Sequence, residues 1–377
     1  MEHEADGMLC PVVIKGIPTM IGRDIYEKLM REIAAGKFAK VGKLPSESKL
    51  ANTFGVARMT VRGALAELQR QGLIETRNGA GSFLTQRARR KSGIIGLVIP
   101  NFEAFEFFAD IRDELERHCK RLNYTVQLVF TREHGREAAI RDIRRKVREL
   151  AVARAEGVIF RPYVAEEFSA ANREVVRIFQ RTEIPVVLID SDITRPPERS
   201  DCDLVAVNNI EAGRRIADYL HQRGHRHIAF LGERRTAAHN VNWDNRLFGL
   251  AGELALLGSA DGVRTLDFGP TDKRALASAL RGKNRVDAIV CGNDESAVAI
   301  VETLRKIGKR VPDDVAVVGF DDIARARTFV PPLTTISQPV KKIAATAFKT
   351  LLARIRYPNN DPREIFLTAP LIARQSA

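Results

Sequence analysis

From Gly93 to the end of the chain, short apolar runs rich in β-branched residues alternate with amphipathic helical stretches. This alternation predicts parallel strands joined by helices, because parallel neighbours need a crossover long enough to hold a helix. The segment has about 285 residues, more than one hydrophobic core usually organises, so we predict two similar lobes. The fold class is then α/β, with a doubly wound sheet in each lobe. The predicted strands are Ile94–Ile99, Val126–Phe130, Val158–Phe160, Val186–Ile189, Ile228–Leu231, Ala288–Cys291 and Val315–Phe320.

Residues 20–85 follow a different pattern, which predicts short helices followed by a β-hairpin. Ser46 can cap the second helix, and Gly55 can turn the chain before the third because glycine adopts positive φ without steric cost. Asn78-Gly79 then lies between two short strand-like runs, which is a strong hairpin signal. Helices, a glycine turn and a hairpin in this order predict a winged helix-turn-helix.

The chain therefore divides into four parts. Residues 1–19 form a tail, 20–85 the winged helix-turn-helix, 86–92 a basic linker, and 93–377 the two-lobed domain. Positive charge is concentrated near the front, since residues 20–92 hold 15 Lys and Arg against 6 Asp and Glu, or +9 of the formal +13. A small basic module on a nearly neutral body is typical of a protein that binds a polyanion such as DNA.

Composition argues against several classes of protein. No apolar run reaches the roughly 18 residues of a membrane helix, and residues 1–19 lack a basic-then-apolar leader, so we expect neither a membrane nor a secreted protein. The cysteines lie far apart without C-x-x-C spacing, which argues against zinc and against a disulfide framework. We expect a cytoplasmic protein with no metal and no cofactor. The cysteines are Cys10, Cys119, Cys202 and Cys291.

The third predicted helix carries the candidate DNA-reading residues. A recognition helix puts its first turn into the major groove, where its side chains meet base edges and phosphates. Arg58 and Arg62 are the strongest candidates. A solvated basic helix face would expose the same residues, but the glycine turn before the helix and the hairpin after it favour DNA; for the hairpin tip both interpretations stay open. The predicted DNA-binding residues are Ser46, Arg58, Met59, Thr60, Arg62, Asn78 and Gly79.

Short motifs in residues 20–85 also carry a family resemblance. They are Leu44-Pro45-Ser46-Glu47, Arg58-x-Thr60-Val61-Arg62-x-Ala64-Leu65, Gly72-Leu73-Ile74 and Gly79-x-Gly81-Ser82-Phe83. This combination resembles the gluconate-repressor (GntR) family of winged helix-turn-helix regulators. The resemblance implies that Arg58 and Arg62 contact operator DNA and that the wing contributes from Asn78-Gly79. Two positions depart from the family pattern: Ser48 stands where the family usually has Arg, and Ala57 where it usually has Ser or Thr.

In the two-lobed domain, polar and aromatic side chains follow the ends of the predicted strands. Ligands of doubly wound sheets bind beyond the carboxyl ends of the strands, so these residues are candidates for a binding site. Carboxylates and amides pair with hydroxyl groups, guanidinium groups orient oxygens and aromatic faces cover a ring, which together favour a sugar or similar polyol. For single residues, above all Asp294 and Asp322, a helix cap is the simpler interpretation. The candidates that follow predicted strands are Asn101, Phe107, Arg161, Asp190, Asn293 and Asp321. Trp243 and Arg246 at the start of a further helix, and Phe268 at the end of the run 265–268, complete the set.

Motifs along residues 93–376 carry a second resemblance. They include Gly96-Leu97-Val98-Ile99-Pro100-Asn101, Asn245-Arg246-x-x-Gly249, Gly292-Asn293-Asp294 and Pro332-Leu333-Thr334-Thr335-Ile336-x-Gln338-Pro339. They resemble the effector domain of the lactose/galactose-repressor (LacI) family, which is similar to periplasmic sugar-binding proteins. The resemblance implies effector contacts at Arg246, Asn293, Asp321 and Gln338, with Phe268 as an aromatic wall. The linker lacks that family's minor-groove hinge helix, and the pairing of the two modules resembles the arabinose-repressor subgroup.

Two other kinds of site were considered. His221, His225 and His227 fall within seven positions, but their surroundings match the entry to a buried strand, so we expect no metal there. An enzyme would need an acid–base pair such as Asp321 with Asp190, and no nucleophile–base pair or phosphate-loop spacing supports it.

We therefore predict a non-enzymatic DNA-binding transcriptional regulator. It acts as a repressor of carbohydrate-utilisation genes under the control of a small sugar-like effector. Its partners are double-stranded operator DNA, the effector and a second copy of the chain in a homodimer, without a membrane. The alternative is a DNA-binding dimer whose effector pocket is vestigial or binds a non-sugar metabolite.

Overall fold

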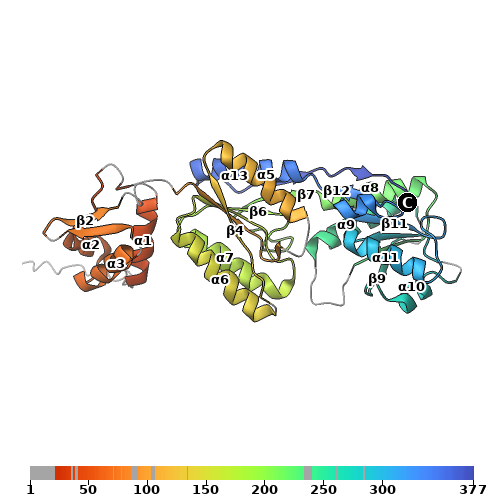
Figure 1. Cartoon of the computed structure of the whole chain (residues 1–377), viewed down its shortest axis with the longest axis horizontal. Helices are drawn as coiled ribbons and strands as arrows, with labels where there is room; N and C mark the ends of the chain where they lie inside the picture. The colour runs from red at the N-terminus through yellow and green to blue at the C-terminus, as the bar shows by residue number, and fades with distance from the viewer. Residues whose placement is uncertain are drawn as a thin grey trace, which may run out of the picture. The chain divides into compact units, whose positions relative to one another are not determined.

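The computed structural model divides the chain into two compact units, residues 1–91 and residues 92–377 (Figure 1). The predicted tail at 1–19 and residues 86–91 of the predicted linker lie outside the described residues. Among the residues that are described, we find no helical stretch with the length and apolar character of a membrane span. The structure describes residues 22–34, 37–38, 41–70, 72–77, 79–85, 92–102, 107–133, 135–232, 240–259, 262–282 and 285–377.

The first unit contains helices followed by an antiparallel hairpin, in the predicted order. Ser46 caps the second helix by accepting a hydrogen bond from the Lys49 amide at 3.3 Å, and Gly55 ends that helix with φ +65°. The inward helix faces form a core that includes the fully buried Leu29 and Leu68. The elements are α1 (Gly22–Ala34), α2 (Glu47–Phe54), α3 (Arg58–Arg70), β1 (Ile74–Arg77) and β2 (Gly81–Leu84).

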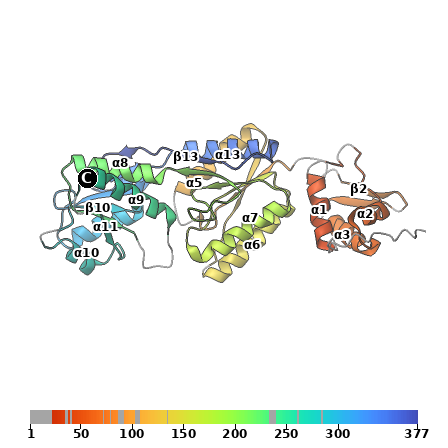
Figure 2. The ribbon, with the colours of Figure 1, turned by 180° about the vertical axis from the view of Figure 1, so that it is seen from behind.

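The second unit contains two six-stranded sheets with helices on both faces, which confirms the predicted α/β class. In the N-terminal lobe the strands run parallel in the order β13-β7-β6-β5-β3-β4. Helices α5 and α13 cover one face of this sheet, and α6 and α7 cover the other (Figures 1 and 2). The elements are β3 (Ile94–Val98), α5 (Phe107–Arg121), β4 (Thr125–Val129), α6 (Arg136–Val152), β5 (Gly157–Phe160), α7 (Ser169–Arg181), β6 (Val186–Ile189), β7 (Asp203–Val207), α13 (Val340–Arg356) and β13 (Glu364–Leu367).

The C-terminal lobe repeats this plan with the order β14-β12-β11-β10-β8-β9, in which only the short β14 pairs antiparallel. Helices α8 and α9 pack on one face of the sheet, and α10 and α11 on the other. The elements are α8 (Asn209–Gln222), β8 (Ile228–Leu231), α9 (Val241–Leu256), β9 (Arg264–Leu266), α10 (Lys273–Ala279), β10 (Ala288–Cys291), α11 (Asp294–Lys306), β11 (Ala316–Asp321), α12 (Ala324–Thr328), β12 (Thr334–Ser337) and β14 (Leu371–Ile372).

Successive residues of each central strand face opposite helix layers, and both layers are apolar. In β3, Ile95 and Leu97 pack with α5 and α13, whereas Val98 packs with α6 and α7. Strands buried on both faces therefore appear in the sequence as continuous apolar runs. This is why the predicted strands agree with the observed ones to within about two residues at each end.

The chain passes between the two sheets at three places. It crosses from β7 to α8, from β12 to α13, and from β13 to β14. Residues at these crossings lie beside the carboxyl ends of the strands in both lobes. The fold thus gathers side chains from distant parts of the sequence where a ligand of a doubly wound sheet binds.

Helices α8 and α9 cross at unusually close range because glycine occupies both sides of the crossing. A Cβ on Gly249 would overlap the Ile210 carbonyl, and a Cβ on Gly213 would overlap the Arg246 carbonyl. Neither obstacle is a flexible side chain, so neither can move aside. This crossing fixes the position of α9, the helix that carries Arg246.

Replacing Gly249 by Ala should destabilise the protein by about 2 kcal/mol or more, because the added methyl group forces the two helix backbones apart. Gly252→Ala is the matched control, since this glycine lies in the same helix and no atom of the described residues is within 4 Å of the added carbon. That variant should gain about 0.5–1 kcal/mol from better helix propensity. Urea unfolding measures both changes, and equal stability of the two variants would contradict the close crossing.

Candidate functional site

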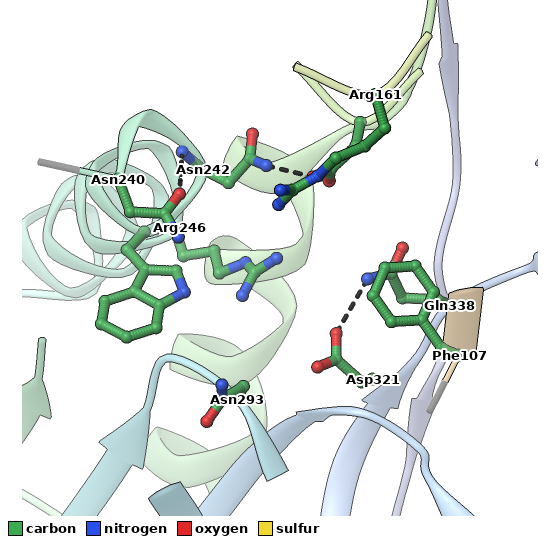
Figure 3. A pocket seen from close by; sticks show the side chains of 10 residues that line it. Phe107, Arg161, Asn240, Asn242, Arg246, Asn293, Asp321 and Gln338 are labelled. Atoms are coloured by element: carbon green, nitrogen blue, oxygen red, sulfur yellow. Dashed lines mark hydrogen bonds and ion pairs between the residues drawn. The ribbon is translucent and has the colours of Figure 1, made fainter. Parts of the chain in front are cut away.

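A cavity of about 370 Å³, part of it open to solvent, lies at the carboxyl ends of the strands of both lobes (Figure 3). Its wall combines two guanidinium groups, two carboxyl groups, four amides and two aromatic rings. Side chains from both lobes contribute, as the crossings of the chain allow. The lining residues are Phe107, Arg161, Asp190, Asn240, Asn242, Trp243, Arg246, Asn293, Asp321 and Gln338.

On the N-terminal lobe, Arg161 organises the wall. It follows β5, keeps only 5% of its surface exposed, and its guanidinium packs over the Phe108 ring at 5.0 Å from the centroid. Its Nε donates to Asp190 Oδ2 at 3.0 Å, and its second nitrogen donates to Asn101 Oδ1 at 3.0 Å. Arg161 thereby connects, through hydrogen bonds, the residues that follow the three neighbouring strands β3, β5 and β6.

A chain of hydrogen bonds continues from this group to the C-terminal lobe. Asn242 Nδ2 donates to the other oxygen of Asp190 at 2.9 Å, and Asn242 Oδ1 accepts from Asn209 Nδ2 at 3.3 Å. Asn209 Oδ1 in turn accepts from Arg246 Nε at 2.9 Å. Side chains thus link the first turns of α8 and α9 to the N-terminal lobe.

Arg246 is the buried cation of the cavity. It extends from α9, lies 3.3 Å from the Phe320 ring centroid and donates to the Gly292 carbonyl. Burial lowers the pKa of this guanidinium to about 10, against the raising influence of Asp321, Asp190 and Asp294. It remains charged at neutral pH, and in Figure 3 it points into the same space as Asp321.

Asp321 ends β11, and its carboxylate accepts a hydrogen bond from Gln338 Nε2 at 2.8 Å. Burial raises the pKa of this carboxyl to about 7, although the Arg246 charge and the Gln338 hydrogen bond both act to lower it. The backbone is strained here as well, with φ of +118° at Asp321 and +73° at Asp190. Strained backbone and shifted pKa values at non-glycine residues are typical of ligand sites.

Eight of the ten predicted ligand-binding residues line the cavity. Asn101 instead stands one contact away, where it holds Arg161. Phe268, expected as an aromatic wall, packs against the apolar core between the sheet and α10 and α11, and is absent from the lining. Sequence analysis did not select Asn240 and Asn242. Their position at the start of α9, beside the selected Trp243 and Arg246, is the signal that could have found them.

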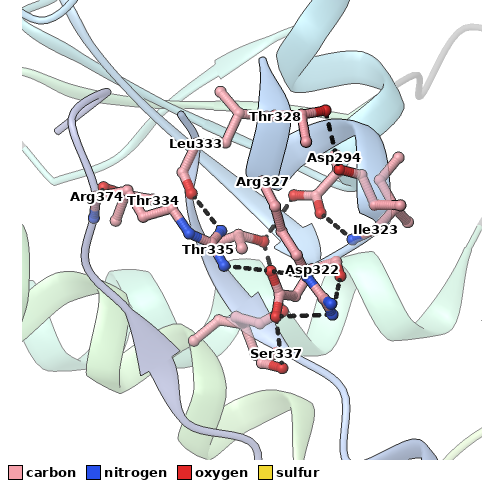
Figure 4. A network of polar contacts seen from close by, with 12 residues as sticks. Asp294, Asp322, Ile323, Arg327, Thr328, Leu333, Thr334, Thr335, Ser337 and Arg374 are labelled. Carbon is pink, nitrogen blue, oxygen red and sulfur yellow. Dashed lines mark hydrogen bonds and ion pairs between the residues drawn. The ribbon is translucent and has the colours of Figure 1, made fainter. Parts of the chain in front are cut away.

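The expectation that Asp294 and Asp322 cap helices is wrong. Asn293 caps α11 by accepting from the Ser296 amide at 2.9 Å, so this cavity residue also has a structural role. Asp294 is fully buried and accepts from Thr335 Oγ1 at 2.6 Å and from the Ile323 amide at 3.0 Å (Figure 4).

Asp322 belongs to the polar network drawn in Figure 4. Arg374, near the end of the chain, donates to Asp322 Oδ1 at 2.6 Å, and Ser337 Oγ lies 3.0 Å from Oδ2. Arg327 pairs with the same carboxylate at 3.3 Å. The network secures the end of β11, where Asp321 faces the cavity.

The second candidate site is the first turn of α3 in the first unit. Arg58, Met59 and Arg62 are exposed there, on the side away from the core. Arg62 pairs with Glu47 of α2 through two hydrogen bonds, Nε to Oε1 at 3.3 Å and a terminal nitrogen to Oε2 at 2.9 Å. Thr60 is half-buried, while Ser46 uses its hydroxyl oxygen to cap α2.

Two further cations that sequence analysis did not single out lie against Phe83 of the hairpin. Lys43 Nζ and Arg77 Cζ lie 5.4 Å and 4.9 Å from the centroid of the Phe83 ring on β2. Lys43 also pairs with Phe83 through the backbone, which attaches the hairpin to the segment before α2. Gly79 turns the tip with φ +71°, and Asn78 lies outside the described residues.

The histidines near residue 225 take part in local structure. His225 Nδ1 lies 3.4 Å from Asp287 Oδ1, and the same aspartate accepts hydrogen bonds from the Arg226 and His227 amides. Within the described ranges, no three His, Cys, Asp or Glu side chains gather in the way a metal site requires.

Comparison with protein families assigns both units. Residues 21–84 match the family of bacterial regulatory proteins, gntR family. Residues 217–377 match the periplasmic binding protein-like domain. A winged helix of this type joined to a two-lobed domain with a polar cavity defines a DNA-binding transcriptional regulator.

The HTH-type transcriptional repressor PurR of Vibrio campbellii is 30% identical over 275 residues, which span 72% of this chain and 77% of that protein. PurR of Vibrio atlanticus is 29% identical over 272 residues, with the same shares of both chains. The chain therefore belongs to the LacI/GalR-type family of HTH-type transcriptional repressors that includes PurR, with a DNA-binding domain of the gntR type.

Solved structures show the same fold. The transcriptional regulator CelR in complex with cellobiose superposes with a TM-score of 0.63 at 22% identity, covering 89% of this chain and 100% of that one. The lac repressor dimer bound to operator and an anti-inducer gives a TM-score of 0.61 at 20% identity, covering 78% of this chain and 96% of that one.

Asp321→Asn should flatten the pH dependence of stability. The folded protein keeps a proton on Asp321 up to about pH 7, whereas the unfolded chain releases it near pH 4. The contribution of the Asp321 carboxyl to the free energy of unfolding is therefore complete below about pH 4 and is lost as the pH rises through about 7. Between about pH 5 and pH 8, the wild type should lose on the order of 2 kcal/mol of unfolding free energy relative to Asp321→Asn.

Urea unfolding of both proteins without ligand, across this pH range, measures the difference. The asparagine keeps an oxygen that can accept from Gln338, so the local hydrogen bond is preserved in the control. Parallel stability curves for the two proteins would contradict the raised pKa.

Proposed function

We propose that the protein is a repressor of carbohydrate-utilisation genes whose binding to operator DNA is controlled by a small sugar. It acts in the cytoplasm as a homodimer and has no catalytic role. The observation that carries the proposal is the cavity, where charged, amide and aromatic side chains from both lobes converge. The alternative of a vestigial pocket would leave the strained Asp321 backbone and the buried Arg246 without a purpose.

The composition of the cavity favours a neutral polyol. Its two guanidinium groups face two carboxyl groups, one of which, Asp321, has a pKa raised to about 7, so the wall carries little net charge. A strongly charged ligand would leave a buried charge uncompensated. Amide and carboxyl oxygens accept from hydroxyl groups, and Phe107 and Trp243 offer apolar surface to a sugar ring. Structures of similar fold carry ribose or cellobiose, which supports a sugar here.

DNA recognition is assigned to α3 and the hairpin. A single winged helix contacts few base pairs, so a symmetric dimer that reads two half-sites supplies both affinity and specificity. Ligand binding at the junction of the lobes can change the relative position of two DNA-reading modules. The free-energy change that the ligand can cause is limited to its difference in binding free energy between the two arrangements.

Arg58→Ala and Arg62→Ala should each weaken operator binding by about 1–3 kcal/mol. A lost base contact relaxes specificity at one position, whereas a lost phosphate contact lowers the salt dependence for every sequence. Arg70→Ala is the control, because Arg70 is also exposed, lies at the far end of α3 and pairs with Glu67. Fluorescence anisotropy on an operator selected from random duplexes gives the affinities, and full affinity in the Arg58/Arg62 double variant would refute the assignment.

Asp321→Ala should abolish the response to the effector and leave operator binding without effector within a few tenths of a kcal/mol of wild type. The effector is identified first, as the mono- or disaccharide that raises the melting temperature of the wild type most. At 100 times its dissociation constant a bound ligand adds about 2.7 kcal/mol to stability.

Gel-shift titrations with and without that sugar then compare the two proteins. If Asp321 merely supported local structure, the variant would be less stable but would still respond. An intact response would remove Asp321 from the site.

A further inference from the structure

The side of α3 that faces away from the core forms an outer ridge. Helical spacing places its residues at i, i+3, i+4 and i+7, on one side of the helix axis and opposite the buried residues. Three of the four are apolar or small, which is unusual for a helix surface that only meets water. The outer ridge consists of Met59, Arg62, Gly63 and Ala66.

Met59 is the most prominent apolar group of the ridge. It keeps 71% of its surface exposed, and its sulfur lies 3.9 Å from a terminal nitrogen of Arg62. That guanidinium is held by the two hydrogen bonds that it donates to Glu47 of α2. The thioether therefore rests against a fixed neighbour instead of against the core.

Gly63 is not required by the packing of the described part of its unit. Among the described residues, nothing lies within 4 Å of a Cβ built at this position. Glycine in a helix interior is less favourable than alanine, so the protein gains no stability from it. Its absent side chain leaves space outside α3, next to Met59.

The chemistry of the ridge identifies what this space accommodates. Methionine carries no charge and no strong hydrogen-bond donor, so Met59 cannot hold a phosphate. Among the groups on base edges in the major groove, the apolar one is the C5-methyl group of thymine, which 5-methylcytosine shares. A flexible thioether suits contact with such a methyl group.

We propose that Met59 determines operator specificity by contacting the C5-methyl group of a thymine, and that Gly63 leaves room for that base edge to approach α3. The inference rests on the proposed function, because it requires α3 to enter the major groove of an operator. Arg58 and Arg62 then supply hydrogen bonds, while Met59 supplies apolar readout of a neighbouring base pair.

Uracil substitution tests the methyl contact directly. An operator is selected with the full-length chain, and each thymine is replaced in turn by deoxyuridine, which removes only the methyl group. The wild type should lose about fourfold in affinity at one thymine of each half-site, as expected for one methyl group returned to water. Met59→Ala should bind thymine and uracil duplexes equally there, and Met59→Leu should restore part of the discrimination.

Cytosine and 5-methylcytosine at the same position separate the two sources of a C5-methyl group. Tighter binding of the methylated cytosine by wild type, but not by Met59→Ala, assigns recognition to the methyl group in either base. No effect of cytosine methylation, together with the loss on uracil substitution, assigns it to thymine alone. A uracil effect of the same size in wild type and Met59→Ala, or no uracil effect at any thymine, would overturn the proposal.

Gly63→Ala provides an independent test. This variant should have a higher melting temperature than wild type but at least about fivefold weaker operator binding, because the added methyl group meets DNA and nothing in the protein. Gly252→Ala, at an exposed helical glycine of α9 with equally open surroundings, should raise the melting temperature and leave operator affinity unchanged. Wild-type affinity in Gly63→Ala would contradict the close approach, whereas failure of the wild type to select any operator would refute the proposed function itself.

Discussion

The hydrogen bond between Asn242 and Asp190, 2.9 Å long, joins side chains of the two lobes across the cavity. On one side Asp190 is fixed by Arg161, and on the other Asn242 connects through Asn209 to Arg246. Both cations of the cavity wall are thus held by one continuous chain of contacts. A ligand that replaces or strengthens any of these bonds changes how the lobes meet, which is the physical basis for an effector response.

The cavity departs from what folding alone favours. Asp321 combines a strained backbone with a carboxyl group that burial keeps partly protonated near neutral pH, and Arg246 is a buried cation held close against the Phe320 ring. The α8–α9 crossing tolerates only glycine at Gly249, so the helix bearing Arg246 has one available position. These constraints lower the stability of the protein but fix the positions of the cavity side chains precisely. This is expected where side chains bind a ligand instead of packing in the core.

Sequence patterns predicted the fold and most of the cavity because apolar runs mark buried parallel strands, and residues after such strands meet at one edge. Sequence patterns failed where the structural role of a residue depends on a partner far away in the sequence. Strand β7 begins with Asp203, whose charge is neutralised by Arg354, 151 positions away, so its sequence did not resemble a buried strand. Asp322 resembled a cap because its partner Arg374 lies 52 positions downstream. Phe268 ends an apolar run, but the run does not reveal that its ring packs inside the lobe.

The proposed function requires that the ligand site in the cavity and the DNA site on α3 are energetically coupled. Thermodynamic linkage requires that the sugar change operator affinity by the same factor by which operator DNA changes sugar affinity. Calorimetric titration of the full-length protein with the identified sugar, with and without saturating operator, measures one factor, and anisotropy titration of the operator measures the other. Energetic coupling of the two sites predicts that the two factors are equal and differ clearly from one, typically five- to 150-fold. Identical sugar affinities for free and operator-bound protein would contradict it.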